Sequence, residues 1–285
     1  MIQAVAIGPD QQVYSTSRAK GSTHVVAHSP AAARSLYETK EALRALWIAA
    51  DGTCHTGGKR YHTNRGGSWT SHATIISEIY AMWGAGDELF LGGANGVVLH
   101  GRAGDWKHIA SAMGSIYCIT GTSARDVYIS GVGYLAHFDG TNVETLASSD
   151  LYEAICVCGE ALWVSNGKAI LSRSFAPLVT SEDALYGLGK GIGGLFVHGG
   201  YQLHRLDGTQ LSLVHDNEDK ALMIKRCEYA TCMASDGRRV VAGGSRSVLV
   251  EDGLGFAEWP ALSAAAAPTK STKPKPTKQK QKSKA

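Results

Sequence analysis

The stretch EIYAMWGAGDELFLGGANGVVLHGRAGDW, residues 78–106, contains four short extended segments that are separated by glycine-containing turns. The next stretch, SIYCITGTSARDVYISGVGYLAHFDGTNV at residues 115–143, repeats its order of Ile-Tyr, Gly, Asp, aromatic, Gly and His. Short runs with a period of two that end at Gly or Asp are typical of β-strands, and no window has a sustained helical period. Each stretch is therefore predicted to form four antiparallel strands.

The same unit recurs along nearly the whole chain. Its second extended segment aligns at Val13-Tyr14, Thr53-Cys54, Leu89-Phe90, Val127-Tyr128, Leu162-Trp163, Leu195-Phe196 and Val240-Val241. The spacing of about 38 residues falls in the range of propellers and solenoids, and four antiparallel strands of that total length form one propeller blade. We therefore predict an all-β fold, a seven-bladed β-propeller of four-stranded blades over residues 1–262.

A solenoid is the competing architecture for repeats of this length. Solenoids use atypical terminal repeats with a polar outer face, whereas the first unit here starts at residue 2 and the last ends near Pro260 without a polar cap. A closed ring needs no cap, because its first and last units cover each other. The repeat therefore favours a closed propeller.

Small residues recur in the first segment of the units, where strands of a propeller converge on the axis. Four of the six cysteines lie in this segment, beside small residues of other units: Cys118, Cys156, Cys158 and Cys232, with Ala49, Ala81 and Gly187. We interpret these cysteines as free thiols that act as small buried hydrophobes. The alignment slips by one residue near Leu151-Tyr152, so the direction of the inner-strand cysteines stays open.

The composition indicates a cytoplasmic globular protein with a separate basic tail. The 285 residues include 34 glycines and 7 prolines, and no apolar run is long enough to cross a bilayer. The N-terminal MIQAVAIGPDQQ has no signal-peptide pattern. Residues 268–285 carry seven lysines and no acid, which leaves 21 basic against 25 acidic residues elsewhere, a net charge of −4.

Residues 263–285 are predicted to be disordered, since Lys, Pro, Thr and Gln cannot form a packed core. The charge of this tail could give weak, nonspecific contact with nucleic acid. It has no arginine for bidentate contacts and no aromatic residue for stacking on bases. We favour the alternative that the tail is solubilising or incidental.

The units resemble the short bacterial propeller repeats related to neuraminidase repeats and photosystem II assembly factors. The matching residues are Trp83-Gly84, Trp106, Asp126-Val127-Tyr128, Gly131, His137 and Asp139-Gly140. The resemblance covers residues 2–260 and implies a propeller architecture without a particular function. The Gly-His and Trp-Asp signatures of WD40 repeats are missing, and the neuraminidase Asp box is degraded to TNRGGSW and RAGDW.

The sequence offers no catalytic motif, so we predict no catalytic residue, no metal and no cofactor. It has no nucleophile elbow, HExxH, P-loop or dinucleotide fingerprint. Four histidines recur in the third strand of successive units, at His62, His100, His137 and His204. Each belongs to its own blade, so they cannot share one metal ion, and we interpret them as half-buried blade residues.

Acids and tyrosines cluster at the connections between units, which share one face of a propeller with the turns between second and third strands. The longest connection, residues 215–228, also carries an apolar quartet that either packs on the last blade or faces a partner. The predicted partner-binding residues are Glu78, Tyr80, Tyr117, Tyr152, Glu153, Glu182, Asp183, Tyr186, Asp216, Glu218, Asp219, Leu222 and Met223. The alternative is that the acids are solvated loop residues and the tyrosines are blade packing.

These residues predict a non-enzymatic, monomeric propeller that binds a protein with a basic surface. Aromatic anchors supply interface energy, and opposite charge guides the encounter. Its sharpest form is an inhibitor or immunity protein that covers a basic site on a bacterial toxin or effector, for example a nuclease. The alternative function is a carbohydrate-binding or glycan-processing propeller that uses the central pocket.

Overall fold

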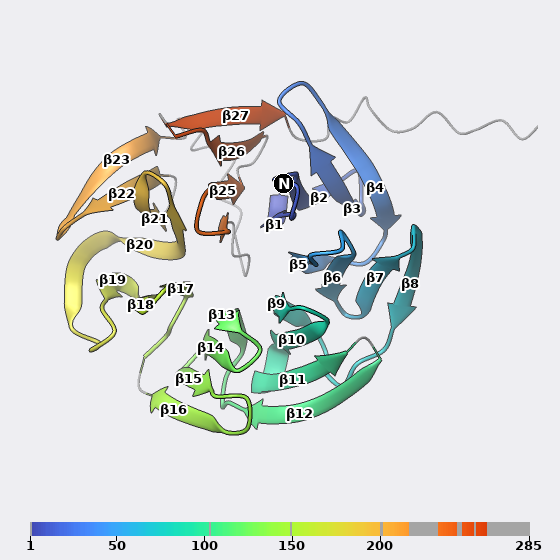
Figure 1. Cartoon of the computed structure of the whole chain (residues 1–285), viewed down its shortest axis with the longest axis horizontal. Coiled ribbons are helices and arrows are strands. Elements are labelled where there is room, and N and C mark those ends of the chain that lie inside the picture. Colours follow the sequence, from blue (N-terminus) through green and yellow to red (C-terminus); the bar gives the residue numbers. More distant parts are fainter. Residues whose placement is uncertain are drawn as a thin grey trace, which may run out of the picture.

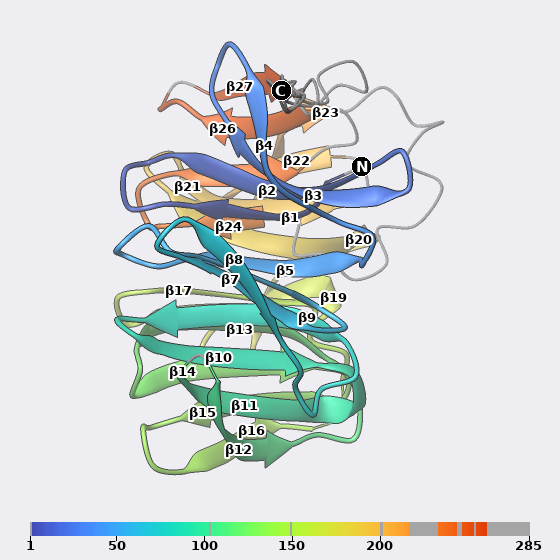
Figure 2. The same ribbon diagram turned by 90° about the vertical axis from the view of Figure 1, so that its right-hand side faces the viewer.

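The computed structural model describes residues 2–102, 104–148, 150–199, 202–216, 233–243, 247–253 and 255–260. Antiparallel sheets stand around a central axis, and the lowest-numbered strand of each separate sheet lies innermost (Figure 1). Seen from the edge of the ring, the strands run roughly along that axis (Figure 2). The predicted all-β propeller is confirmed.

Five separate four-stranded sheets are present in the described ranges, and we call them blades. The first two blades contain β1 (Ile2–Ile7), β2 (Val13–Ala19), β3 (Ser22–His28), β4 (Ala33–Thr39), β5 (Leu43–Ile48), β6 (Cys54–Gly58), β7 (Tyr61–Arg65) and β8 (Ser68–His72). The third and fourth contain β9 (Ile79–Ala85), β10 (Glu88–Gly93), the 3-10 helix η1 (Ala94–Gly96), β11 (Val97–Arg102), β12 (Asp105–Ser111), β13 (Ile116–Ser123), β14 (Asp126–Gly131), β15 (Tyr134–Phe138) and β16 (Val143–Ala147). The last blade contains β24 (Met233–Ser235), β25 (Val240–Gly243), β26 (Ser247–Glu251) and β27 (Phe256–Pro260).

The remaining strands form one seven-stranded sheet, so the predicted count of seven separate blades is wrong. This sheet contains β17 (Ala154–Cys158), β18 (Ala161–Ser165), β19 (Gly167–Leu171), β20 (Pro177–Gly191), β21 (Gly194–Gly199), β22 (Gln202–Asp207) and β23 (Gln210–Asp216). The 15-residue β20 pairs with β19 mainly through its first part and with β21 through its second.

The merger follows from the sequence of β20. Residues 178–186, LVTSEDALY, contain neither glycine nor proline, the strongest breakers of a strand, although Ser181 and Asp183 are of types that are common in turns. The backbone stays extended through Glu182 and Asp183 and carries the chain from the rim of the ring to its centre (Figure 1). Two expected blades are thereby joined in one sheet.

Neighbouring blades interlock through a glycine on the second strand of one and an isoleucine on the first strand of the next. A Cβ atom on Gly92 would lie 2.5 Å from Cγ2 of Ile116, and one on Gly57 would lie 2.7 Å from Cγ2 of Ile79. Real Cβ atoms do not approach other atoms so closely, so only glycine fits at these positions without a shift. The recurring glycines are therefore packing residues.

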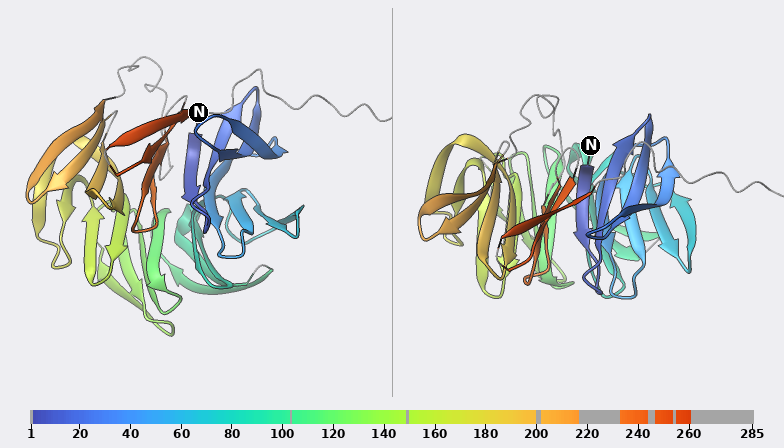
Figure 3. Two further views of the ribbon diagram at one scale, coloured as in Figure 1. Left: turned by 45° about the horizontal axis from the view of Figure 1, so that its top comes forward. Right: turned by 90° about the horizontal axis from the view of Figure 1, so that it is seen from above.

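Side-chain packing between β1 and the last blade closes the ring, and β1 lies beside β24 and β25 (Figure 3). Gly243 repeats the interlock here, because its Cβ would lie 2.7 Å from Cγ2 of Ile2. The buried imidazole of His28 donates from Nδ1 to the carbonyl oxygen of Pro260 at 3.0 Å. Its Nε2 is hydrogen-bonded to the Ser15 hydroxyl at 2.8 Å. Burial lowers the pKa of His28 and keeps the ring neutral.

His62, His100 and His137 lie in three separate blades, and His204 lies in β22 of the seven-stranded sheet. His62 is buried, unlike the half-buried position that was predicted. His100 Nε2 is 2.8 Å from the Glu88 carboxylate, and its ring stacks on Phe90 with centroids 4.2 Å apart. His137 Nε2 is 2.8 Å from the Asp126 carboxylate in the next blade. Burial opposes ionisation of Asp126, but hydrogen bonds from Thr122 and His137 hold the pKa of this carboxyl below its usual range. These pairs tie second strands to third strands.

The Gly92 interlock predicts that Gly92→Ala lowers the free energy of unfolding by about 2 kcal/mol, because Ile116 or the blade must move. Urea titrations followed by tryptophan fluorescence measure this. Gly255→Ala is the matched control, since nothing lies within 4 Å of a Cβ there, and it should change stability by less than about 0.5 kcal/mol. In Gly92→Ala/Ile116→Ala the two losses should not add; full additivity would contradict the interlock.

Two buried histidines predict a loss of stability in mild acid. Burial lowers the pKa of His55 and of His198 to about 4, below the value of about 6.5 in an unfolded chain. The unfolded state therefore binds more protons between these values, and stability falls as the pH drops through 6.5 toward 4. Each histidine should cost about 2 kcal/mol between pH 7 and pH 5.

The variants His55→Gln and His198→Gln isolate this effect from the titration of carboxyl groups. Each should reduce the difference in unfolding free energy between pH 7 and pH 5 by about 2 kcal/mol. Equal pH differences in the wild type and both variants would show that these histidines do not carry the acid sensitivity.

Candidate functional site

We call the four strands of a blade a to d, from the innermost to the outermost, and we call one side of the ring the d–a face. It consists of the connections from the outermost strand of one blade to the innermost strand of the next, together with the turns between second and third strands. The opposite a–b face carries the turns between first and second strands. Chain direction within the blades puts the start of every innermost strand at the d–a face.

A β-bulge occurs at the d–a end of five innermost strands. The pairing register skips one residue between Ile2 and Ala4, and the same one-residue step recurs in β5, β9, β13 and β20. The skipped residues are Gln3, Arg44, Tyr80, Tyr117 and Tyr186. Bulges re-aim side chains and recur next to functional sites. Three of the predicted tyrosines thus share one structural position.

The second-strand glycines oppose these bulges. A Cβ atom on Gly93 would collide with the carbonyl oxygen of Glu78, and one on Gly131 would collide with that of Ser115. At these two positions only glycine fits beside the extra residue, whereas in the first blade Ser17 of β2 pairs with Ile2 next to the Gln3 bulge. The bulge adds one residue to these innermost strands, whereas β17 has no bulge, and this difference is the structural cause of the one-residue slip in the sequence alignment near Leu151-Tyr152.

Arg44, Glu78, Tyr80 and Tyr117 form a linked group between adjacent blades. Arg44 Nε donates to Glu78 Oε1 at 2.6 Å, and the Tyr80 hydroxyl donates to Glu78 Oε2 at 3.1 Å. The Arg44 guanidinium lies 5.8 Å from the centroid of the Tyr80 ring, and the Tyr80 and Tyr117 centroids are 6.2 Å apart. The negative charge of Glu78 is therefore balanced within the protein, so it supports Tyr80 rather than presenting an open charge.

Tyr152 and Glu153 precede β17, which has no bulge at its d–a end. Tyr152 is 3% exposed and packs with Cys118, Tyr128 and Leu135, so its side chain offers almost no surface to a partner. Glu153 is half-buried, and burial raises the pKa of its carboxyl. Of the predicted tyrosines, Tyr152 thus fits the blade-packing alternative.

Glu182, Asp183 and Tyr186 lie within β20 at the point where it crosses from rim to centre. Glu182 and Asp183 are exposed, and Tyr186 is 40% exposed. These residues were expected on a loop, and a continuous strand holds them instead. A rigid element fixes their spacing more firmly than a loop would.

The other predicted residues belong to the connection between β23 and β24. Asp216 is the last residue of β23. Glu218, Asp219, Leu222 and Met223 lie outside the described residues, as does the lysine tail at 263–285. Their role stays a prediction.

Four exposed apolar residues in the described connections and turns of the d–a face were missed in the sequence. Ile75, between β8 and β9, is 71% exposed, Met113 is fully exposed, and Val132 and Leu151 are 41% and 38% exposed. Val132 and Leu151 form an isolated antiparallel bridge, and a Cβ on Gly114 would lie 2.5 Å from that of Val132. We call Met113, Val132 and Leu151 the Met113 patch. Its sequence signal is an apolar residue in a turn or connection, where polar residues are usual.

The described thiols and histidines offer no sign of a reactive centre. Cys54, Cys118, Cys156 and Cys158 are free, and burial raises the pKa of the first three to about 12, 11 and 12. Thiols with such pKa values are poor nucleophiles at neutral pH. No group of three or more metal-ligating side chains converges in the described ranges. No helix among these residues has the length and apolar character needed to cross a membrane.

Comparison with known proteins supports the fold. No family model and no curated protein matches the chain. The crystal structure of RRP9 WD40 repeats is similar with a TM-score of 0.65 and 12% identity, over 85% of this chain and 86% of that one. The structure of U3-55K has the same TM-score and identity, with 85% and 88% covered. At this identity the similarity shows a WD40-like β-propeller fold and nothing about function.

A bacterial structure shows the same likeness in part of a larger chain. The extracellular domain of the putative hybrid two component system BT4673 from B. thetaiotaomicron has a TM-score of 0.66 and 11% identity. The match covers 93% of this chain and 38% of that one.

The Arg44–Glu78 contact predicts a measurable coupling energy. Their side chains are each 24% exposed, so a double-mutant cycle with Arg44→Met and Glu78→Gln should give about 1 kcal/mol in unfolding experiments. Arg102 and Asp87 are the matched control, since their 3.0 Å contact joins side chains that are each 69% exposed. Arg102→Met and Asp87→Asn should couple by less than about 0.3 kcal/mol. Equal coupling in both pairs would contradict the structural role of Glu78.

Proposed function

We propose that this propeller is a non-catalytic scaffold that binds a protein partner through its d–a face. The observation that carries the proposal is the Met113 patch, an exposed apolar surface next to acids that have no ion-pair partner among the described residues. WD40-like propellers of known structure support the general idea of a protein-interaction scaffold.

Charge supports a partner with a basic surface. Asp150, Glu182 and Asp183 are exposed on this face, and Glu153 is half-buried there. None of the four makes an ion pair within the described part of the chain, whereas Glu78 does. Uncompensated acids on one face attract basic surfaces and guide their approach.

The apolar residues supply the burial energy of an interface, which charge alone does not provide. Met113 and Leu151 stand on connections that are tied to the second-strand turn of the fourth blade, because Val132 N donates to Ser115 O at 3.0 Å and Gly133 N donates to Asp150 O at 2.8 Å. A rigid apolar centre with polar surroundings is the usual anatomy of an interface. Methionine is also common at surfaces that adapt to their partner.

The narrower form of the proposal is an inhibitor or immunity protein that covers a basic site on a bacterial toxin or effector. A nucleic-acid groove is positively charged and would complement the acids of the d–a face. We place this activity in the cytoplasm, since the four described cysteines are free thiols, as a reducing compartment requires.

Two surface changes test the d–a face. Met113→Asp, and the pair Glu182→Lys with Asp183→Lys, should each reduce capture of the partner from the native host by about tenfold, because one removes an apolar anchor and the other reverses the charge. Quantitative mass spectrometry of affinity-purified complexes measures the loss. Raising the salt concentration should weaken wild-type capture as well.

Matched controls lie on the opposite face. Ile192 is 75% exposed in the turn between β20 and β21, and Glu160 is exposed in the turn between β17 and β18. Ile192→Asp and Glu160→Lys repeat the same chemical changes on the a–b face and should leave capture unchanged. Loss of capture in the controls alone would assign binding to the a–b face and reject the proposal.

A further inference from the structure

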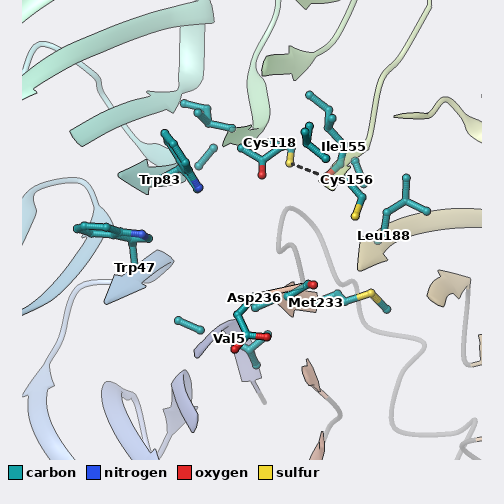
Figure 4. Close-up of a pocket in the computed structure, with 18 of the residues that line it drawn as sticks. Val5, Trp47, Trp83, Cys118, Ile155, Cys156, Leu188, Met233 and Asp236 are labelled. Atoms are coloured by element: carbon teal, nitrogen blue, oxygen red, sulfur yellow. Dashed lines mark hydrogen bonds between the residues drawn. The ribbon is translucent and has the colours of Figure 1, made fainter. Parts of the chain in front are cut away.

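The innermost strands enclose a cavity of about 510 Å³ along the axis of the ring. It extends from Tyr117 near the d–a face to Asp236 and Gly237 in an a–b turn. Trp47, Trp83, Cys118, Cys156, Leu188 and Met233 line it from different strands (Figure 4). Its volume is that of a small-molecule site, and its lining combines apolar and sulfur-containing side chains with polar groups.

Trp47 and Trp83 occupy equivalent positions in β5 and β9 and are held in place by neighbouring blades. A Cβ atom on Gly84 would lie 2.8 Å from Cζ2 and Cη2 of Trp47, and one on Gly121 would lie 3.1 Å from Cη2 of Trp83. Each indole also contacts a ring of its own blade: His55 for Trp47, and Phe90 for Trp83. Packing therefore fixes the direction of both indoles before any ligand binds.

The nitrogen edges of both indoles face the cavity (Figure 4). Neither N–H group donates to an acceptor in the described part of the chain, and both remain open to the cavity. The cysteine thiols nearby are protonated, since burial raises the pKa of Cys118 to about 11 and of Cys156 to about 12. The side-chain groups that await a partner here are thus donors.

Among the described residues, the cavity offers no side-chain cation to an anionic ligand. Asp236 is its one charged lining side chain within the described ranges. The carboxylate of Asp236 already accepts hydrogen bonds from Gln11 Nε2 at 2.6 Å and from the backbone N–H groups of Arg238 and Arg239. A ligand with a net negative charge would lose its hydration without gaining a cation.

We propose that this cavity binds a neutral small molecule with an apolar ring system and a carbonyl-type oxygen, which accepts hydrogen bonds from the Trp47 and Trp83 indoles. The ring system lies against Leu188, Met233 and the thiols, and the oxygen points toward the two indole edges. This site is separate from the protein-binding d–a face and does not depend on it.

The test uses the neutral fluorescent ketone prodan, whose emission reports both the polarity around it and hydrogen bonding to its carbonyl. The wild-type protein should bind one equivalent saturably. Trp47→Phe and Trp83→Phe keep an aromatic ring but remove the N–H group, and each should weaken binding about fivefold, the effect of one hydrogen bond. Emission should also shift, because the carbonyl loses a donor.

Trp69→Phe is the matched control, because Trp69 stacks on Tyr37 between outermost strands and does not line the cavity. It should bind prodan as the wild type does. Thermal melts of all variants separate lost binding from lost folding, and a variant that has lost its fold is replaced by Ala234→Leu, which fills the cavity beside Met233. Absence of saturable binding by the wild type, or equal binding by all folded variants, would overturn the proposal.

Discussion

The close approach of a second-strand glycine to the first strand of the next blade sets the geometry of this propeller. Gly57 faces Ile79, Gly92 faces Ile116, and Gly243 faces Ile2 across the closing seam. A ring can close only if every blade holds the same angle to its neighbour, and each interlock fixes that angle with a buried isoleucine. The seam thus uses the same contact as the junctions at Gly57 and Gly92, with the His28–Pro260 hydrogen bond added.

Gly57 and Gly92 are each followed by a second glycine, Gly58 and Gly93, which has a different consequence. Because Gly93 leaves room for the carbonyl of Glu78, the first strand can take in an extra residue at its d–a end. The strand register skips that residue, and the position is occupied by Gln3, Arg44 or tyrosine. In the second and third blades, one Gly-Gly dipeptide therefore serves both the packing of the blades and the placement of side chains at one mouth of the channel.

The sequence was sufficient to predict the all-β propeller but not the number of separate blades, because a similar strand and turn pattern recurs along the chain. The merger at β20 was not predicted, because Ser181, Glu182 and Asp183 in LVTSEDALY are polar residues of the kind expected in a connection. The site was harder to predict. Glu78 and Arg44 are 34 residues apart, and nothing local shows that this acid, unlike Asp183, is compensated. Likewise, the Met113 patch exists because separate connections meet through backbone contacts.

The two proposed binding sites require ligands of different charge, and the distribution of charged groups in the protein suits both. Acids at the d–a face favour a basic protein and disfavour anions that approach the channel from that side. Asp236 marks the a–b end of the cavity with the same sign. Between them, the indole N–H groups of Trp47 and Trp83 provide donors without a positive charge. The field of the protein thus selects a neutral acceptor for the cavity and a cationic surface for the face, so the two ligands would not compete for the same groups.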